Sequence, residues 1–137
     1  MFCDISPTCY KIALQKEIIK RHIKNFLRHE RYADTRQSEP LPCLVADCSS
    51  HLIKRGKGID PVLQENKAVN IKLANARMNG ILIHPGETFS FWHLVGKTTK
   101  RKGYRDGRIL VRNHLLPGIG GGLCNLANTI HRVVLLS

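Results

Sequence analysis

The sequence predicts an α+β domain in which a long N-terminal helix and a central helix pack on a small, mostly antiparallel sheet, and a glycine-rich turn leads into a C-terminal helix. Three observations support this prediction: two helical segments that begin with proline, several short apolar runs, and four glycines between residues 118 and 122. The 137 residues, of which 42% are hydrophobic and 23% charged, suffice for one globular domain. This composition excludes a disordered chain, a collagen-like repeat and a heptad rod.

The first expected element is a basic amphipathic helix from about residue 7 to about residue 31, within a first unit of residues 1–32. Ser6 and Pro7 are a typical helix start, because the hydroxyl accepts a hydrogen bond from a free amide and proline has no amide to satisfy. Apolar residues then recur at three- and four-residue spacing. We expect this stripe to face the core, and the alternative is docking on an anionic polymer or on a membrane surface through Lys16, Lys20 and Lys24.

Residues 33–57 are expected to form a connector and a first strand. The stretch from 33 to 42 is polar and contains two prolines, whereas Leu44–Cys48 has the composition of a short strand. The central helix then begins at Asp60-Pro61, a cap followed by a first-turn proline, and ends near Asn79-Gly80. On this helix we expect Asn66, Lys67 and Asn70 to face away from the core.

The remaining strands are expected near Ile81, from Thr88 to Val95 around Phe89, and from Ile109 to Leu116, because short apolar runs occur there. A basic loop of residues 96–108 separates the last two strands. The final helix is expected to begin near Leu123 or Cys124, directly after the glycines. It ends on an apolar run without a closing signal, and we expect a C-terminal part of the protein to be missing.

The charge of the chain indicates an anionic partner. The sequence has 22 Lys and Arg against 10 Asp and Glu, a formal net charge of +12. Nucleic acid is the least favoured partner, because the basic residues are dispersed and aromatic residues make up only 6%. No apolar run reaches the roughly 18 residues needed to span a bilayer, and the N-terminus lacks the features of a secretory signal. We therefore expect a cytoplasmic protein, or one that is peripheral at the inner face of the membrane.

The five cysteines are expected to be thiols, because a reducing compartment is the default without a secretory signal. The spacings of Cys3 to Cys9 and of Cys43 to Cys48 do not match those of a zinc site. We expect no metal and no cofactor.

The glycine-rich turn before Cys124 is the strongest local signal for a functional site. Glycines allow successive amides to point at one anion, and the following helix adds the positive end of its dipole. The turn lacks the residues of a nucleotide-binding motif. Amides beside Cys124 would favour its thiolate or stabilise an oxyanion, which suggests a nucleophile. The alternative is that Cys124 is a small buried residue of the core.

Four motifs in the second half of the chain form a specific combination. They are Gln64-Glu65-Asn66-Lys67 with Asn70 and Leu73, Asn79-Gly80-Ile81-Leu82-Ile83, Pro85-Gly86-Glu87-Thr88-Phe89-Ser90-Phe91-Trp92, and Gly120-Gly121-Gly122-Leu123-Cys124 with Asn128. Together these motifs resemble the VanW family of accessory proteins from glycopeptide (vancomycin) resistance clusters. The resemblance extends over residues 58–137, which we take as the core unit.

The resemblance implies a role in the bacterial cell envelope and in vancomycin resistance. Asn125 and Ala127 depart from the family pattern, which usually has Gln and often has Ser or Thr at these two positions. Members of the family continue into a β-rich segment that contains histidine, so a catalytic base would lie in that segment.

Two functions are consistent with these features. The first is an accessory protein that binds an anionic wall precursor or polymer. The second is a cysteine-dependent hydrolase or acyl transferase acting on a wall peptide, with Cys124 as the nucleophile; whether the protein is an enzyme stays open. The candidate ligand-binding residues are Gly120, Gly121, Gly122, Asn125, Glu87, Arg101 and Arg105.

Overall fold

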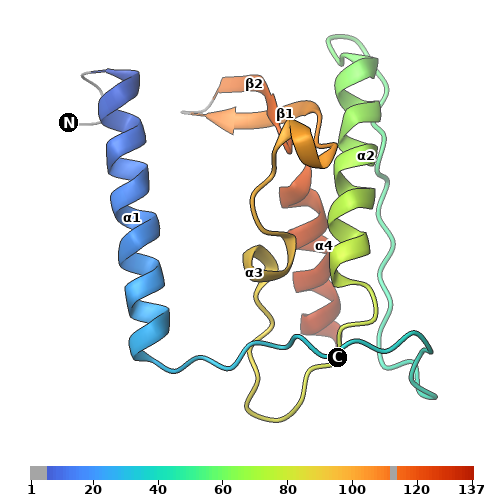
Figure 1. The fold of residues 1–137 in the computed structure, drawn as a ribbon. Helices are drawn as coiled ribbons and strands as arrows, with labels where there is room; N and C mark the ends of the chain where they lie inside the picture. Colours follow the sequence, from blue (N-terminus) through green and yellow to red (C-terminus); the bar gives the residue numbers. More distant parts are fainter. Residues whose placement is uncertain (1–5, 112–113) are drawn as a thin grey trace.

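The computed structural model describes residues 6–111 and 114–137, and it confirms the α+β class (Figure 1). An antiparallel hairpin and a bundle of helices around α2 form the main body. In chain order the elements are α1 (Pro7–Leu27), α2 (Pro61–Met78), α3 (Phe91–Val95), the 3₁₀ turn η2 (Lys100–Lys102), β1 (Asp106–Val111), β2 (His114–Ile119) and α4 (Leu123–Leu136).

Both predicted helix starts are confirmed by their capping bonds. The Ser6 hydroxyl accepts a hydrogen bond from the Cys9 amide at 3.2 Å. The Asp60 carboxylate accepts one from the Val62 amide at 2.8 Å. Each side chain thus satisfies an amide that has no partner within the helix, which is why these two residues fix the beginnings of α1 and α2.

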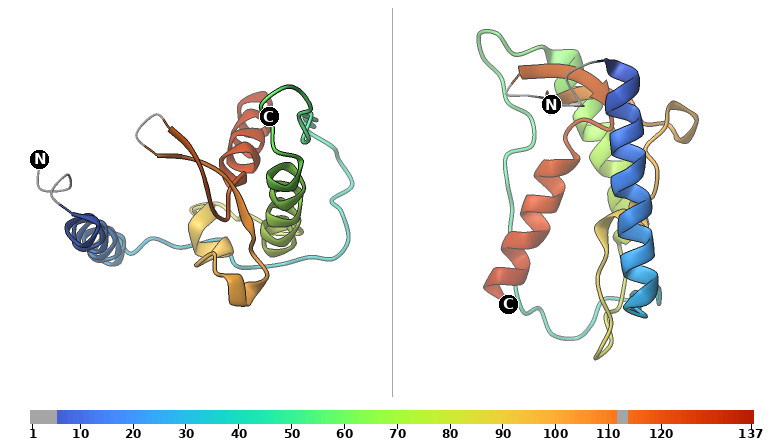
Figure 2. Two further views of the ribbon diagram at one scale, coloured as in Figure 1. Left: turned by 90° about the horizontal axis from the view of Figure 1, so that it is seen from above. Right: turned by 90° about the vertical axis from the view of Figure 1, so that its left-hand side faces the viewer.

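The core lies between α2, α3 and α4. Its buried members are Ala74 and Met78 of α2, Val95 of α3, Tyr104, and Leu123 of α4. β1 packs on α2, and the hairpin continues through a short turn into α4. Figure 2 shows α2 and α4 side by side with the hairpin across one end. This arrangement places the glycine-rich turn where three elements meet.

Helix α1 stands apart from this body in Figures 1 and 2. Its apolar side chains remain exposed: Phe26 is 78% exposed and Ile12 57%. The stripe expected to face the core therefore does not pack against it within the described part of the chain. Residues 28–60, which connect α1 to α2, form no helix or strand, and Tyr32 and Arg36 make only isolated bridges with Thr88 and Ile81.

Two expected strands are wrong. Leu44–Cys48 forms no strand, and Leu44 is 83% exposed, because no neighbouring strand offers its backbone a partner. Around Phe89, the predicted strand is replaced by the short helix α3, in which the Gly96 amide donates to the Trp92 carbonyl at 2.9 Å. Five nearly all-apolar residues fit a helix and a strand equally well, so periodicity could not distinguish the two.

The other two expected strands are partly confirmed. Near Ile81 the chain forms only an isolated antiparallel bridge with Arg36. The expected strand from Ile109 to Leu116 consists of two antiparallel strands, β1 and β2, in which Ile109 pairs with Leu116. The connection between them, residues 112–113, lies outside the described residues, as does Cys3. None of the helices in the described ranges is long and apolar enough to cross a membrane.

Candidate functional site

The glycine-rich turn joins the end of β2 to the start of α4. Gly120 and Gly121 are buried, and their amides already donate to backbone carbonyls, those of Arg105 at 3.0 Å and Gly118 at 3.1 Å. Gly122 has a φ of 98° and serves as the N-cap of α4, a conformation that favours glycine. The turn is therefore a packed structural junction, and among its described residues only the amides of Gly122, Leu123 and Cys124, at the start of α4, are left without a backbone acceptor.

Asn70 of α2 holds this junction in place through hydrogen bonds of its side chain. Its side chain is completely buried. The Nδ2 group donates to the Arg105 and Gly121 carbonyls, both at 2.9 Å, and Oδ1 accepts from the Arg105 amide at 2.8 Å. One helix turn earlier, Asn66 Nδ2 donates to the Asp106 carbonyl at 2.9 Å. These amide side chains act as substitutes for a third strand, since they satisfy backbone groups along one edge of the hairpin.

The junction is also held by close backbone approaches that require glycine. A Cβ atom on Gly107 would lie 2.7 Å from the Gly121 carbonyl oxygen, and one on Gly121 would overlap the Gly107 carbonyl. A Cβ on Gly122 would overlap the side chain of Lys67, which crosses the turn at this point. The three glycines thus allow β1, the turn and α2 to pack in direct contact.

Cys124 lies in the first turn of α4 and its side chain is exposed. The alternative of a buried core cysteine is therefore wrong. No described histidine or carboxylate forms a hydrogen bond with its sulfur, and His131 is two turns further along the helix. Asn125 is half-buried, and its amide donates to the Gly122 carbonyl at 3.0 Å. The catalytic role of Cys124 stays a prediction.

The other described cysteines also carry free thiols. They are Cys9, Cys43 and Cys48. Within the described ranges, no group of three His, Cys, Asp or Glu residues is arranged to hold a metal ion.

The Glu87 side chain stabilises the turn in which it lies, because its Oε2 accepts a hydrogen bond from the His84 amide at 3.0 Å. This bond closes the turn that precedes Thr88, so the carboxylate has a structural partner there. A ligand-binding role for Glu87 stays a prediction.

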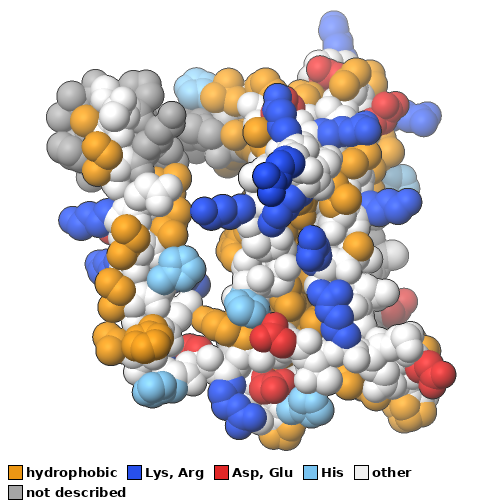
Figure 3. Space-filling view, viewed as in Figure 1, with side chains coloured by type: hydrophobic (Ala, Val, Ile, Leu, Met, Phe, Trp, Pro, Cys, Tyr) orange, Lys and Arg blue, Asp and Glu red, His pale blue; other side chains and the backbone are white. Residues whose placement is uncertain are grey.

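Exposed cations gather on residues 97–105, the segment that directly precedes β1. We call this the basic patch, and Figure 3 shows Lys and Arg side chains concentrated on the face over this region. One of its charges is paired: Lys100 Nζ lies 3.5 Å from Asp106 Oδ2. Its members, all exposed, are Lys97, Lys100, Arg101, Lys102 and Arg105.

The sequence analysis placed two residues of α2 on the wrong face. Lys67 and Asn70 were expected to face away from the core, but Lys67 is only 9% exposed and Asn70 is completely buried. Burial, followed by the charges of Lys54 and Arg108, lowers the pKa of Lys67 from its usual value. A usable signal was the spacing of Lys67 with Asn66 and Asn70, which places all three on one side of a helix.

A comparison with known protein families finds a match in the part of the chain that contains this site. Residues 66–137 match the family described as VanW like protein, which is more than half of the chain. The chain belongs to the VanW family. The matched range of the VanW family contains Asn66, Asn70, the basic patch, the hairpin, the glycine-rich turn and Cys124, whereas α1 and Lys54 lie outside it.

Two curated relatives extend this result. The Vancomycin B-type resistance protein VanW of Enterococcus faecalis (strain ATCC 700802 / V583) is 41% identical over 104 residues, which are 76% of this chain and 38% of the relative. The uncharacterized protein YoaR of Bacillus subtilis (strain 168) is 36% identical over 70 residues, 51% of this chain and 23% of the relative. The chain thus spans well under half of either relative. No solved structure matches it.

Proposed function

We propose that this VanW-family chain is an accessory protein of cell-envelope metabolism or glycopeptide resistance that binds an anionic wall-related ligand through the basic patch. The name of the Enterococcus faecalis relative, a vancomycin B-type resistance protein, supports the setting. The patch itself is the observation that carries the proposal, because its cations lie together on one exposed face (Figure 3). A surface of this kind attracts polyanions over distances comparable to the Debye length.

The backbone under the patch is held in place, which makes the spacing of its charges reproducible. Asn70 bonds both backbone groups of Arg105. The Thr99 carbonyl accepts hydrogen bonds from Lys102 at 3.0 Å and Tyr104 at 3.3 Å. Tyr104 is 4% exposed and anchors the segment in the core. Since these anchors set the positions of the side chains before a ligand arrives, less conformational entropy is lost on binding.

Replacing Arg101 and Arg105 together by alanine is expected to weaken binding of a poly(glycerol phosphate) oligomer by about fivefold to tenfold, because each exposed charge contact contributes up to about 1 kcal/mol. Affinity is measured by fluorescence titration at low ionic strength. The matched control is Lys57→Ala with Lys72→Ala, which removes two exposed lysines elsewhere. An equal loss in the control, or no binding by the unaltered protein, would contradict the proposal. Tighter binding to DNA of equal charge would favour the nucleic-acid alternative.

A contact with the membrane surface through α1 is the second part of this proposal. The exposed apolar residues of α1 lie beside its lysines, and Ile12, Gln15, Lys16 and Ile19 line a hollow of about 470 Å³. An anionic membrane surface provides both an apolar layer and negative charge, which suits a helix of this composition. The helix was also expected, as an alternative, to dock through Lys16, Lys20 and Lys24, and all three are exposed.

Replacing Lys16, Lys20 and Lys24 by glutamine is expected to reduce co-sedimentation with vesicles of phosphatidylglycerol by at least about tenfold, since each lysine near an anionic surface contributes about 1 kcal/mol. Vesicles of phosphatidylcholine serve as the control and are expected to bind neither protein. Equal binding of the two proteins to anionic vesicles would show that α1 does not make this contact.

A further inference from the structure

Four apolar residues of α1 form one stripe along the helix and remain exposed. Their spacings of seven, four and three positions place them on a single helix face. Most of the stability of a helix in a protein comes from packing of such a face against another element. The stripe therefore indicates a surface on which α1 packs. Its members are Ile12, Ile19, Ile23 and Phe26, each more than half exposed.

The hairpin of β1 and β2 has an outer face that is also apolar and exposed. Its inner face contains Gly107, which is buried against the glycine-rich turn. On the other face Leu110 lies directly opposite Leu115, and the two are 67% and 58% exposed. Ile119 follows on this face four positions after Leu115. Because the exposed face of an antiparallel sheet is normally polar, this outer face lacks a cover.

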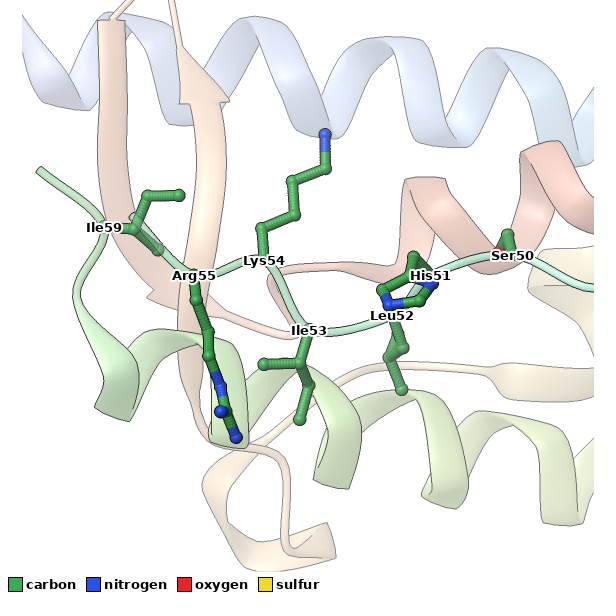
Figure 4. A pocket seen from close by; sticks show the side chains of 7 residues that line it. All are labelled: Ser50, His51, Leu52, Ile53, Lys54, Arg55 and Ile59. Carbon is green, nitrogen blue, oxygen red and sulfur yellow. The ribbon is translucent and has the colours of Figure 1, made fainter. Parts of the chain in front are cut away.

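The opposite side of the body is already covered by the chain itself. Residues 50–55 run along α2 on the side away from α1 and line an open hollow of about 820 Å³ (Figure 2). Figure 4 shows that Leu52 and Ile53 of this segment point toward α2. The Ser50 hydroxyl lies 3.5 Å from that of Thr129 on α4. The outer face of the hairpin is thus the apolar surface left for α1.

The segment after α1 is docked on the body from residue 30 onward. The Arg31 carbonyl accepts a hydrogen bond from the Thr88 amide at 2.7 Å, and the Glu30 carboxylate accepts one from the Thr88 hydroxyl at 3.0 Å. Ala33 is 1% exposed, and its amide donates to the Thr88 carbonyl at 3.2 Å. This docking fixes the point from which α1 departs.

Only residues 28–29 separate the docked segment from the end of α1 at Leu27. His29 has a φ of 48° and is the one non-glycine residue in the described ranges with a left-handed backbone. Hinges are usually a few residues at the end of an element that absorb a change in backbone angles. A change at residues 28–29 alone would swing the whole of α1.

We propose that α1 closes on the outer face of the hairpin about the hinge at residues 28–29. Figure 1 shows the N-terminal part of α1 at the level of the hairpin and its C-terminal end at the level of the docked segment, and the right view of Figure 2 agrees. A swing about the hinge therefore brings Ile12 and Ile19 to Leu110 and Leu115 without a shift along the helix axis. The short tether gives the stripe a high effective concentration at this face.

The closure does not depend on the proposed membrane contact of α1, although both use the same helix. The lysines of α1 and the cations of the basic patch repel each other, and salt screens this repulsion. Closure is thus expected to strengthen as ionic strength rises, whereas attraction of α1 to an anionic membrane weakens. The test below contains no vesicles, so the failure of one proposal leaves the other standing.

The test is hydrogen exchange of the 137-residue protein, followed by mass spectrometry. Leu110→Glu with Leu115→Glu is expected to speed exchange of the α1 amides at least about fivefold, because an uncovered helix opens more often. Exchange of α2 reports whether the body of this variant stays folded. Val62→Glu, at an exposed apolar position of α2, is the control and is expected to leave exchange of α1 unchanged.

The reciprocal change is made on α1, which contributes nothing to the buried core. Ile19→Glu is expected to speed exchange of residues 114–119 by about fivefold, because closure also protects the hairpin. Leu14→Glu is the matched control, since Leu14 is 46% exposed and lies on the opposite face of the same helix. It is expected to exchange as the unaltered protein does.

Two results would overturn the proposal. The first is exchange of α1 and of the hairpin that none of these variants changes. The second is protection of α1 that falls when the protein is diluted tenfold, because the covering hairpin would then belong to a second copy of the chain. Protection that is equal at both concentrations supports closure within one chain.

Discussion

Replacing Asn70 by leucine is expected to lower the free energy of unfolding by about 3–5 kcal/mol. The side chain is fully buried and makes three hydrogen bonds, two to carbonyls and one to the Arg105 amide. Leucine has a similar volume but cannot replace these bonds, so the partners are left buried without water, at about 1–3 kcal/mol for each unsatisfied group. The measurement is urea unfolding followed by circular dichroism, analysed by linear extrapolation.

Asn75→Leu is the matched control, because Asn75 is an exposed asparagine of the same helix. Its replacement is expected to change stability by no more than about 0.5 kcal/mol. A loss in Asn70→Leu no larger than in the control would show that the hairpin and the glycine-rich turn do not rely on the amide.

The role of Asn70 connects the stability of the fold to the proposed binding surface. Its bonds to Arg105 hold one end of the basic patch, and its bond to Gly121 holds the turn over which Lys67 passes. A single buried amide thus fixes the relative positions of α2, β1 and the start of α4. Loss of this amide is expected to loosen the basic patch and the glycine-rich turn together.

The three long helices α1, α2 and α4 were predictable because their signals are local. Ser6 and Asp60 accept capping bonds from amides at most three positions away, and Gly122 lies directly before α4 in a conformation that favours glycine. The strands were predictable only in part, because a strand needs a partner that lies elsewhere in the chain. Leu44-Val45 has suitable composition but no partner, and the run after Ser90 had no feature that distinguishes a helix from a strand.

Part of the candidate site was predictable because its signals are also local. The glycines and Cys124 are adjacent in sequence, so the turn and its helix could be recognised there. The bonds of the Gly120 and Gly121 amides, and the burial of Lys67, depend on how the hairpin lies on α2. A lysine between two asparagines is typical of an exposed helix face, and only the packed structure shows that this face is covered.

Gly121→Ala is expected to destabilise the protein by about 3 kcal/mol or more. Its backbone φ is not in the left-handed region, so the conformation itself suits any residue. An added Cβ, however, would lie 2.6 Å from the Arg108 amide nitrogen and would overlap the Gly107 carbonyl. These are backbone atoms of β1, which cannot move aside as a flexible side chain does, and overpacking of this kind is strongly destabilising.

Gly86→Ala separates this contact effect from glycine's conformational freedom. Gly86 has a φ of +79°, but a Cβ there would meet nothing within 4 Å. Its replacement is expected to lose only about 1–2 kcal/mol, the ordinary penalty for a left-handed residue with a side chain. Thermal and urea unfolding of the two variants give the ranking. If Gly86→Ala proved the more damaging change, backbone conformation and not the approach of β1 to the turn would determine the role of these glycines.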